Sequence, residues 1–320
     1  MELRSLCLDT NLRTTRVRLS HPDRNLDTEL LADATERLLG FAAPFVDHLR
    51  ATGLVPSGRL FDVLSVDADQ KRVKVRVGEH DHLLDYGQVQ NLLREVARNA
   101  RREAVARKPD PAGLSPEARW EHLYNHGGDG WEMGRPTPPL QRYLTAQPIL
   151  AGQRALVIGC GRGHEAIVLG QASEQGAQII GIDIAPSAVQ LATQQADALG
   201  LSGSVRFQLQ DLFTWTEHDP SQQGAYDLVV EHNCFCAIEP QHRDDYVAAV
   251  AQLLRPGGRL VGLFYPHDYP GGPPYASTAD EIQRRLQAAF SITYQETPTD
   301  SAITRAGLEL LLVAERRASG

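Results

Sequence analysis

The sequence is poor in cysteine and has no long apolar run. Its four cysteines are spread over 320 residues and none forms a CxxC pair, so we expect neither a disulfide framework nor a paired metal or redox motif. No stretch of about 18 apolar residues occurs, and residues 1–24 lack the apolar segment of a secretory signal. We therefore expect a reduced, cytoplasmic protein that does not act at a membrane.

An excess of positive charge is also absent. Lys and Arg total 32 against 40 Asp and Glu, a net charge of −8, which argues against nucleic acid as the main partner. The acidity is uneven, because residues 111–320 hold 23 acidic and 14 basic side chains while residues 1–110 hold 17 and 18. This split predicts two parts with different roles.

The first part combines helical and strand-like patterns, which predicts a small α+β domain over residues 1–107. Its role and its protein partner cannot be derived from the sequence. Two prolines and a glycine in residues 108–113 predict a linker, so the second domain would span 114–320. The patterned segments of the first part are a helix within 30–49, a hairpin of strands at 59–66 and 72–77, and a helix over 86–107.

The second part alternates short apolar runs with amphipathic helical stretches. This order is typical of an α/β fold in which helices cover both faces of a mostly parallel sheet. We predict seven strands, at 154–158, 178–182, 205–209, 228–230, 259–264, 291–295 and 308–314, with helices at 165–175, 186–199, 246–254 and 279–290.

A glycine-rich loop, Gly159-Cys-Gly161-Arg-Gly163, directly follows the first of these strands. Such a loop lets the backbone approach a nucleotide at the start of the next helix. Asp183 ends the second strand 20 residues after Gly163. This sequence spacing is typical of a carboxylate that binds ribose hydroxyls. His164 stands where a GxGxxG fingerprint has its third glycine, which disfavours a pyrophosphate ligand.

A third element of a nucleotide pocket follows the third strand as Asp211-Leu212-Phe213. Asp211 would accept a hydrogen bond from an adenine amino group, with Leu212 and Phe213 against the ring. The alternative is that Asp211 only caps a turn. Together, the loop and the two acidic positions describe the adenosyl pocket of a Rossmann-like class I methyltransferase.

The order of several further motifs resembles the thiopurine S-methyltransferase family, which includes plant and bacterial thiol and halide methyltransferases. The resemblance covers about residues 117–316 and implies S-adenosylmethionine as the cofactor. Val157, where other class I methyltransferases have an acidic residue, fits it as well. The motifs are Trp120-Glu-His-Leu-Tyr124, Gly130-Trp-Glu-Met-Gly-Arg135, Pro138-Pro-Leu140, Gly159-Cys-Gly161, Cys234-Phe-Cys-Ala-Ile238, Arg243 and Gly272-Pro-Pro-Tyr275.

The resemblance also implies roles for individual residues. Aromatic rings before the first strand would form a lid over the cofactor, since an aromatic face attracts a sulfonium cation; ordinary packing is the alternative for each ring. By resemblance, the cofactor-binding residues are Trp120, Tyr124 and Trp131 in the lid, Gly159 and Gly161 at the methionyl part, Asp183 at the ribose, Asp211 and Leu212 at the adenine, and Glu231 near the sulfonium.

The acceptor side departs from the family at one position. Thiopurine enzymes carry an arginine just after the fourth strand, and this sequence has His232 there. A histidine could act as general base or water-mediated relay, or could simply bond to backbone at a strand end. We expect Arg243 and Tyr275 to reach the acceptor pocket. Cys234 and Cys236 lack further ligands, so we expect small buried residues and no metal site.

These observations predict methyl transfer from S-adenosylmethionine to a small soft nucleophile. A thiol is the first choice, because a few per cent of it is already thiolate at neutral pH; halide, hydrosulfide, selenium and tellurium species are close relatives. An N- or O-methyltransferase of a small metabolite, which would need His232 as a base, is one alternative. A noncatalytic protein that binds S-adenosylmethionine is another.

Overall fold

The computed structural model of the chain describes residues 9–10, 17–18, 62–67, 72–77, 80–85, 113–126, 131–268, 271–301, 305 and 307–318. The helices predicted within 30–49 and over 86–107, and all but the last residue of the predicted linker, lie outside the described residues. The chain divides into two compact units, residues 1–104 with 302–304 and residues 105–301 with 305–320. None of the described helices is long and apolar enough to cross a lipid bilayer.

The first unit contains short antiparallel strands. β1 (Asp9–Thr10) pairs with β2 (Val17–Arg18). β3 (Asp62–Asp67) and β4 (Arg72–Val77) form the predicted hairpin, and β5 (His80–Asp85) adds a third antiparallel strand that the sequence pattern did not reveal. Arg72 and Lys74 on β4 are exposed, as their alternation with valines predicts.

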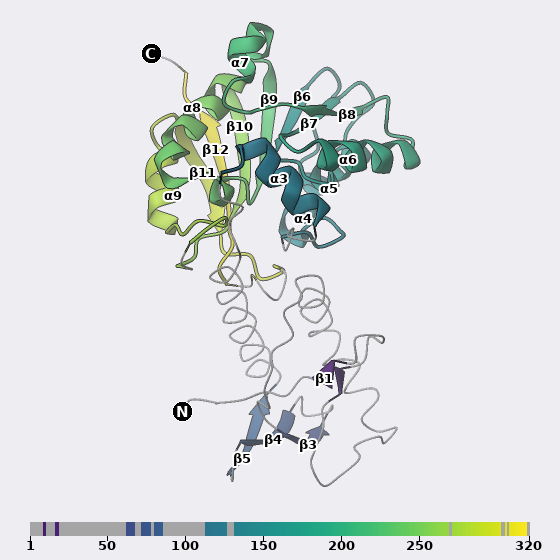
Figure 1. Cartoon of the computed structure of the whole chain (residues 1–320), viewed down its shortest axis with the longest axis vertical. Coiled ribbons are helices and arrows are strands. Elements are labelled where there is room, and N and C mark those ends of the chain that lie inside the picture. The colour runs from purple at the N-terminus through teal and green to yellow at the C-terminus, as the bar shows by residue number, and fades with distance from the viewer. Residues whose placement is uncertain are drawn as a thin grey trace. The chain divides into compact units, whose positions relative to one another are not determined.

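The second unit is built on a seven-stranded sheet, in the order β11-β12-β10-β9-β6-β7-β8 (Figure 1). Neighbouring strands from β10 to β8 run parallel, whereas β12 runs antiparallel to both of its neighbours. All seven predicted strands are present. Their bounds are β6 Arg154–Ile158, β7 Gln178–Asp183, β8 Val205–Leu209, β9 Tyr226–His232, β10 Leu254–Phe264, β11 Phe290–Glu296 and β12 Leu310–Arg316.

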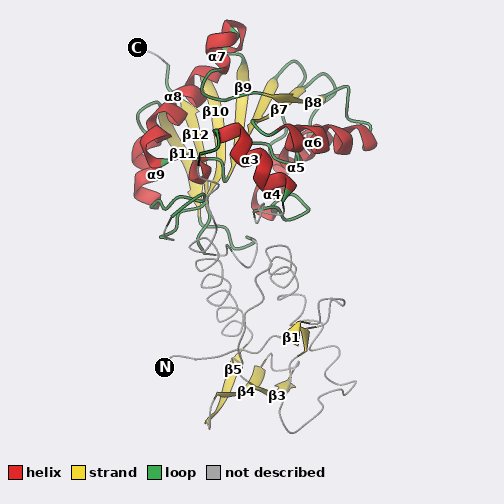
Figure 2. Ribbon diagram, viewed as in Figure 1, coloured by secondary structure: helices red, strands yellow, loops and turns green. Residues whose placement is uncertain are grey.

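Helices pack against both faces of this sheet (Figure 2). One hydrophobic core lies under α7, α8 and α9, and the other under α4, α5 and the end of α6. Because both faces are covered, the central strands read as continuous apolar runs rather than alternating ones. The helices are α3 Pro116–Asn125, α4 Pro138–Ala146, α5 His164–Ala172, α6 Pro186–Ala198, α7 Trp215–His218, α8 Arg243–Leu253 and α9 Ala279–Leu286.

Three of these helices were not expected, and one expected turn is part of a strand. α3 and α4 begin at prolines, and α7 is only four residues long. The predicted turn at 255–258 lies within β10, where pairing with β9 shifts register between Leu254 and Arg259. The helix predicted over 279–290 ends at Leu286, because Phe290 already starts β11.

The chain order reverses at β6, which has β7 on one side and β9 on the other. In open α/β sheets, ligands bind beyond the carboxyl ends of the strands at such a reversal. Ile158, the last residue of β6, pairs with Glu231 on β9. The glycine-rich loop after β6 and the end of β9 at His232 therefore lie side by side.

Candidate functional site

The loop after β6 makes its turn through glycines. Gly159, Gly161 and Gly163 all have left-handed backbone, with φ of 53°, 52° and 84°. A Cβ atom on Gly163 would lie 2.6 Å from the Phe207 ring, and one on Gly161 would lie 3.0 Å from the Tyr124 hydroxyl. The loop therefore depends on glycine both for its conformation and for its contacts.

Asp183 anchors this loop from the end of β7. Its carboxylate accepts hydrogen bonds of 2.9 Å from the backbone N–H of Gly161 and of Ala185, and the residue is 7% exposed. Burial raises the pKa of Asp183, although its backbone hydrogen bonds oppose that shift. Each carboxylate oxygen has two lone pairs, so the side chain can still accept further hydrogen bonds.

The predicted aromatic residues come together over the loop. The ring centroids of Trp120 and Trp131 are 5.3 Å apart, and those of Tyr124 and Trp131 are 5.6 Å apart, both in edge-to-face arrangements. Burial, with the nearby charges of Asp183 and Cys160, raises the pKa of Tyr124 well above its usual value. We call Trp120, Tyr124 and Trp131 the aromatic cluster.

The helix that carries two of these rings is held at two places. Glu121 on α3 accepts hydrogen bonds of 2.9 Å from both the backbone N–H and the hydroxyl of Ser187 at the start of α6. Arg119 on α3 donates to the Tyr275 hydroxyl at 3.4 Å and lies 3.8 Å from Glu239. α3 thus lies across the carboxyl edge of the sheet.

A small cavity lies between the aromatic cluster and the glycine-rich loop. It has a volume of about 50 Å³, against about 300–1,000 Å³ for the pockets that hold small-molecule ligands. Asn233, which follows β9 with a left-handed φ of 60°, reaches its wall. The cavity is lined by Tyr124, Trp131, Glu132, Met133, Arg135, Val157 to Arg162, His164, Glu165, His232 and Asn233.

His232 lies in this wall between two charged side chains. Its Nδ1 is 3.2 Å from Oε1 of Glu165, and its Nε2 is 2.9 Å from NH1 of Arg305. Arg305 is 1% exposed; it also donates to the backbone oxygen of Trp131 at 2.8 Å and lies 3.5 Å from Glu309. Sequence reasoning missed Arg305, since the contact joins residues 73 positions apart and no motif surrounds it.

A contact between Glu132, which follows Trp131, and His164, which follows the glycine-rich loop, connects these two segments. Oε1 of Glu132 lies 2.8 Å from Nε2 of His164, and Arg162 is 3.8 Å from the same carboxylate. Burial opposes the ionisation of both groups, but the mutual hydrogen bond and charge prevail, so that the pKa of His164 is raised and that of Glu132 is lowered.

Glu231 does not line the cavity. Successive side chains of a strand point to opposite faces, and Glu231 lies on the other face from His232, where Oε2 accepts from the backbone N–H of Phe235 at 2.8 Å and from the Tyr246 hydroxyl at 3.3 Å. Burial raises the pKa of Glu231 to about 8. Its Oε1 has no hydrogen-bond partner among the described residues.

Asp211 and Leu212 take up positions that fit the turn-capping alternative. Asp211 accepts a hydrogen bond of 2.9 Å from the backbone N–H of Phe213. Leu212 is buried in the core under α7 to α9, with Phe213 packed against it. Neither Asp211 nor Leu212 lines the cavity. Their contact with adenine therefore remains a prediction.

Arg243 and Tyr275 also lie away from the cavity. Arg243, 1% exposed, donates to the backbone oxygens of Tyr275 and Ala276 and to Glu281, and its guanidinium lies 4.8 Å from the centre of the Phe235 ring. The hydroxyl of Tyr275 receives the hydrogen bond from Arg119. Both residues therefore fix the loop on which α3 rests, and their predicted role in the acceptor pocket remains a prediction.

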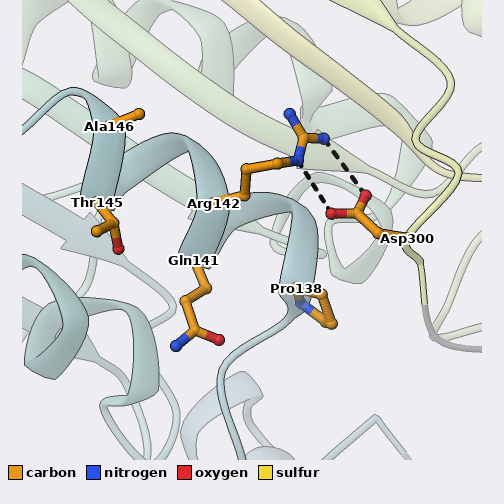
Figure 3. Close-up of a pocket in the computed structure, with 6 residues that line it drawn as sticks. All are labelled: Pro138, Gln141, Arg142, Thr145, Ala146 and Asp300. Atoms are coloured by element: carbon orange, nitrogen blue, oxygen red, sulfur yellow. Dashed lines mark hydrogen bonds and ion pairs between the residues drawn. The ribbon is translucent and has the colours of Figure 1, made fainter.

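A hollow on the outer side of α4 offers no comparable chemistry. It measures about 490 Å³ and is lined by Pro138, Gln141, Arg142, Thr145, Ala146 and Asp300. Figure 3 shows its one charged pair, in which Nε of Arg142 donates to Asp300 at 3.0 Å. Within the part of the chain that the structure describes, no three or more His, Cys, Asp or Glu side chains are grouped to hold a metal ion.

Comparison with known proteins identifies the family of the chain. The family model for thiopurine S-methyltransferase matches residues 115–309, more than half of the chain. A probable thiol methyltransferase 2 from Arabidopsis thaliana is 33% identical over 168 residues, which cover 52% of this chain and 70% of that protein. Thiocyanate methyltransferase 1 from Brassica oleracea is 32% identical over 200 residues, covering 61% of this chain and 83% of that protein.

Among solved structures, a SAM-dependent methyltransferase from Aquifex aeolicus overlaps with a TM-score of 0.45 at 15% identity, covering 55% of this chain and 89% of that one. The resemblance found in the sequence motifs is confirmed by the family match. The chain therefore belongs to the thiopurine S-methyltransferase family and is a methyltransferase that uses S-adenosylmethionine.

Proposed function

We propose that this methyltransferase methylates the sulfur of a small thiol. Halides, hydrosulfide and selenium or tellurium species are related acceptors. The observation that carries the proposal is the contact of Arg305 with His232 in the cavity wall beside Trp131. A thiol acceptor must lose a proton and benefits from a nearby cation, and this pair supplies a basic nitrogen and a guanidinium side by side.

The residues around the cavity fit S-adenosylmethionine. In this proposal Asp183 accepts from the ribose hydroxyls, the loop from Gly159 to Gly161 contacts the methionyl part, and the aromatic cluster faces the sulfonium. The supporting observation is that the Tyr124 hydroxyl lies so close to the glycine-rich loop that a Cβ on Gly161 would be only 3.0 Å from it. When bound, the cofactor supplies a methyl group on a positively charged sulfur.

The same residues must open to admit a ligand. Because the cavity holds only about 50 Å³, a nucleoside enters only if the aromatic cluster moves away from the glycine-rich loop. We therefore assign α3 and Trp131 the role of a lid. Once closed, it excludes water and aligns acceptor and methyl group, which is the main demand of an in-line displacement.

Arg305 and His232 would act on the acceptor. A thiolate formed beside the guanidinium is stabilised relative to the thiol. Nδ1 of His232 faces Glu165 and Nε2 faces Arg305. In this proposal, His232 takes up the proton that the thiol loses. This arrangement suits thiols that are protonated at neutral pH, and it also suits acceptors without a proton, such as halides.

The setting of the reaction is part of the proposal. Cys160 and Cys234 take part in no disulfide bond, which supports the reducing cytoplasm as the location. We retain residues 1–107 as a separate domain of unknown role, joined by 108–113 to the methyltransferase domain at 114–320.

A panel of acceptors tests this function. The purified full chain is given S-adenosylmethionine with 2-mercaptoethanol, sodium hydrosulfide, potassium iodide, a primary amine or a phenol, and S-adenosylhomocysteine release is measured. We expect turnover with the sulfur compounds to exceed turnover with the amine and the phenol. Preference for the amine or the phenol would support the N- or O-methyltransferase, and binding without turnover on any acceptor would support the noncatalytic protein.

A further inference from the structure

Glu165 is a buried carboxyl group in the cavity wall, and the cofactor contacts proposed above do not include it. It belongs to the first turn of α5 and is 6% exposed. Its Oε1 lies 3.2 Å from Nδ1 of His232 and accepts a long hydrogen bond of 3.5 Å from the backbone N–H of Thr137. Its close side-chain partner is therefore the imidazole in the cavity wall.

The proton on the His232 ring is placed by its two neighbours. A guanidinium has donors and no acceptor, so Nε2, which lies 2.9 Å from NH1 of Arg305, must hold a lone pair. A neutral ring then carries its hydrogen on Nδ1, where the carboxylate of Glu165 accepts it. This assignment makes Nε2 the basic atom of His232.

The pKa of the Glu165 carboxyl group is lowered by its neighbours. Burial raises this pKa, but the charge that His232 carries when protonated, its hydrogen bond and the charge of His164 outweigh burial and hold the pKa of Glu165 below its usual value. A carboxylate behind an imidazole fixes the tautomer and stabilises the imidazolium that forms when the far nitrogen takes a proton.

We propose that Glu165 is a positioning residue that holds His232 with Nε2 as the proton acceptor for a thiol substrate. The inference rests on the proposed thiol methylation. This role explains why a carboxylate is buried at the start of α5 and why both ring nitrogens of His232 have a charged partner.

The proton transfer involves few atoms. The S–H bond of the acceptor breaks, its proton goes to Nε2, and the electron pair stays on sulfur. That pair forms the new bond to the methyl carbon while the bond between this carbon and the donor sulfur breaks, its electrons going to the donor sulfur. Arg305 can release Nε2 to the thiol because Trp131 and Glu309 remain its partners.

A purely structural role for Glu165 predicts something different. If the carboxylate only joined α5 to Thr137, its loss would disturb the cavity and slow every acceptor alike. A role through His232 slows only acceptors that still carry a proton. Acceptor acidity therefore separates the two roles.

The experiment compares two thiols in the full chain. 2-Mercaptoethanol is protonated at neutral pH and 4-nitrothiophenol is already a thiolate. We expect Glu165→Gln to lower kcat for 2-mercaptoethanol by about 100-fold, the lower range for loss of a general base, and to leave kcat for 4-nitrothiophenol within about threefold. The matched control is Glu217→Gln, because Glu217 is exposed on α7; it should leave both rates unchanged.

Equal losses with both thiols would overturn the role of Glu165 while leaving thiol methylation intact. If the wild-type chain methylates neither thiol, the proposed function itself fails. A second measurement needs no variant: long-range ¹H–¹⁵N spectra of the histidine rings should show His232 protonated on Nδ1 in the wild-type chain. A proton on Nε2 of the neutral ring would contradict the proposal.

Discussion

Glu132 and His164 form a charged hydrogen bond of 2.8 Å between the residue that follows Trp131 and the first turn of α5. Both side chains are less than one fifth exposed. The pair therefore joins the proposed lid to the glycine-rich loop, and its charge state bears on how firmly the aromatic cluster is held.

This pair predicts a pH dependence of the aromatic cluster. The pKa of His164 is raised, so its stabilising charge is fully present below pH 6.5 and is lost as pH rises through the raised pKa. The pKa of Glu132 is lowered, so its contribution is present above pH 4.5 and is lost as pH falls through the lowered pKa. Acrylamide quenching of tryptophan fluorescence should be least between these limits and increase on the alkaline side.

The variant Glu132→Gln checks the cause of that change. It should increase quenching at pH 6 and flatten the alkaline rise, since about 1 kcal/mol of attraction between the two side chains is lost. Glu217→Gln, at an exposed position of α7, serves as the control and should retain the wild-type curve. A curve unchanged by Glu132→Gln would show that the pair does not hold Trp131.

Asp183 should determine the affinity for the cofactor. Replacing it by alanine removes a charged acceptor from the ribose and from the N–H of Gly161. Hydrogen bonds to charged groups contribute about 1.5–3 kcal/mol, so the Kd for S-adenosylmethionine should rise roughly 10- to 100-fold. Calorimetry on Asp183→Ala and on the exposed control Asp244→Ala measures this Kd. An unchanged Kd in folded Asp183→Ala would show that Asp183 does not bind the cofactor.

Glu231 predicts a second, separate pH effect on stability. Its pKa of about 8 in the folded chain lies above the usual 4.5, so the folded state holds a proton that the unfolded state has lost. Stability should therefore fall as pH rises from about 4.5 to about 8. Glu231→Gln should flatten this slope and be more stable than wild type at pH 9 in urea titrations, and an unaltered slope would mean that Glu231 is not its source.

Arg243 should contribute to stability rather than to chemistry. It is almost fully buried and holds the loop at Tyr275 and Ala276. Replacing it by alanine leaves these carbonyl oxygens without their donor, at a cost of about 3 kcal/mol. The urea midpoint should fall, while kcat at 20 °C with saturating substrates changes less than about threefold because Arg243 does not line the cavity. An unchanged urea midpoint together with lost turnover would contradict this account and support a role for Arg243 in the acceptor pocket.

The sheet could be predicted from the sequence because its central strands are buried on both faces. Leu156, Val157 and Ile158 form an unbroken apolar run, which is typical of a parallel strand that is covered on both faces. β5, with two histidines and two aspartates in six residues, has no such signature. α3 was missed for a similar reason, because Leu123 is its one buried residue and no apolar stripe runs along it.

The site was predicted in part. Spacing along the chain was enough to place Asp183 at the loop, since it lies at the end of a predicted strand, whereas the family resemblance grouped the aromatic cluster. Comparison with the family placed both Glu231 and His232 at the site, whereas strand alternation sends them to opposite faces. Arg305 comes from the segment between β11 and β12, and only the folded chain brings it to His232.

The transfer of a labelled methyl group to sulfur tests thiol methylation most directly. The full chain is incubated with S-adenosylmethionine carrying a ¹³C methyl group and with 2-mercaptoethanol, and the products are followed by NMR. We predict an S-methyl thioether signal that grows in step with S-adenosylhomocysteine. Label that appears on oxygen or nitrogen acceptors in a mixed panel, with none on sulfur, would contradict the proposed function.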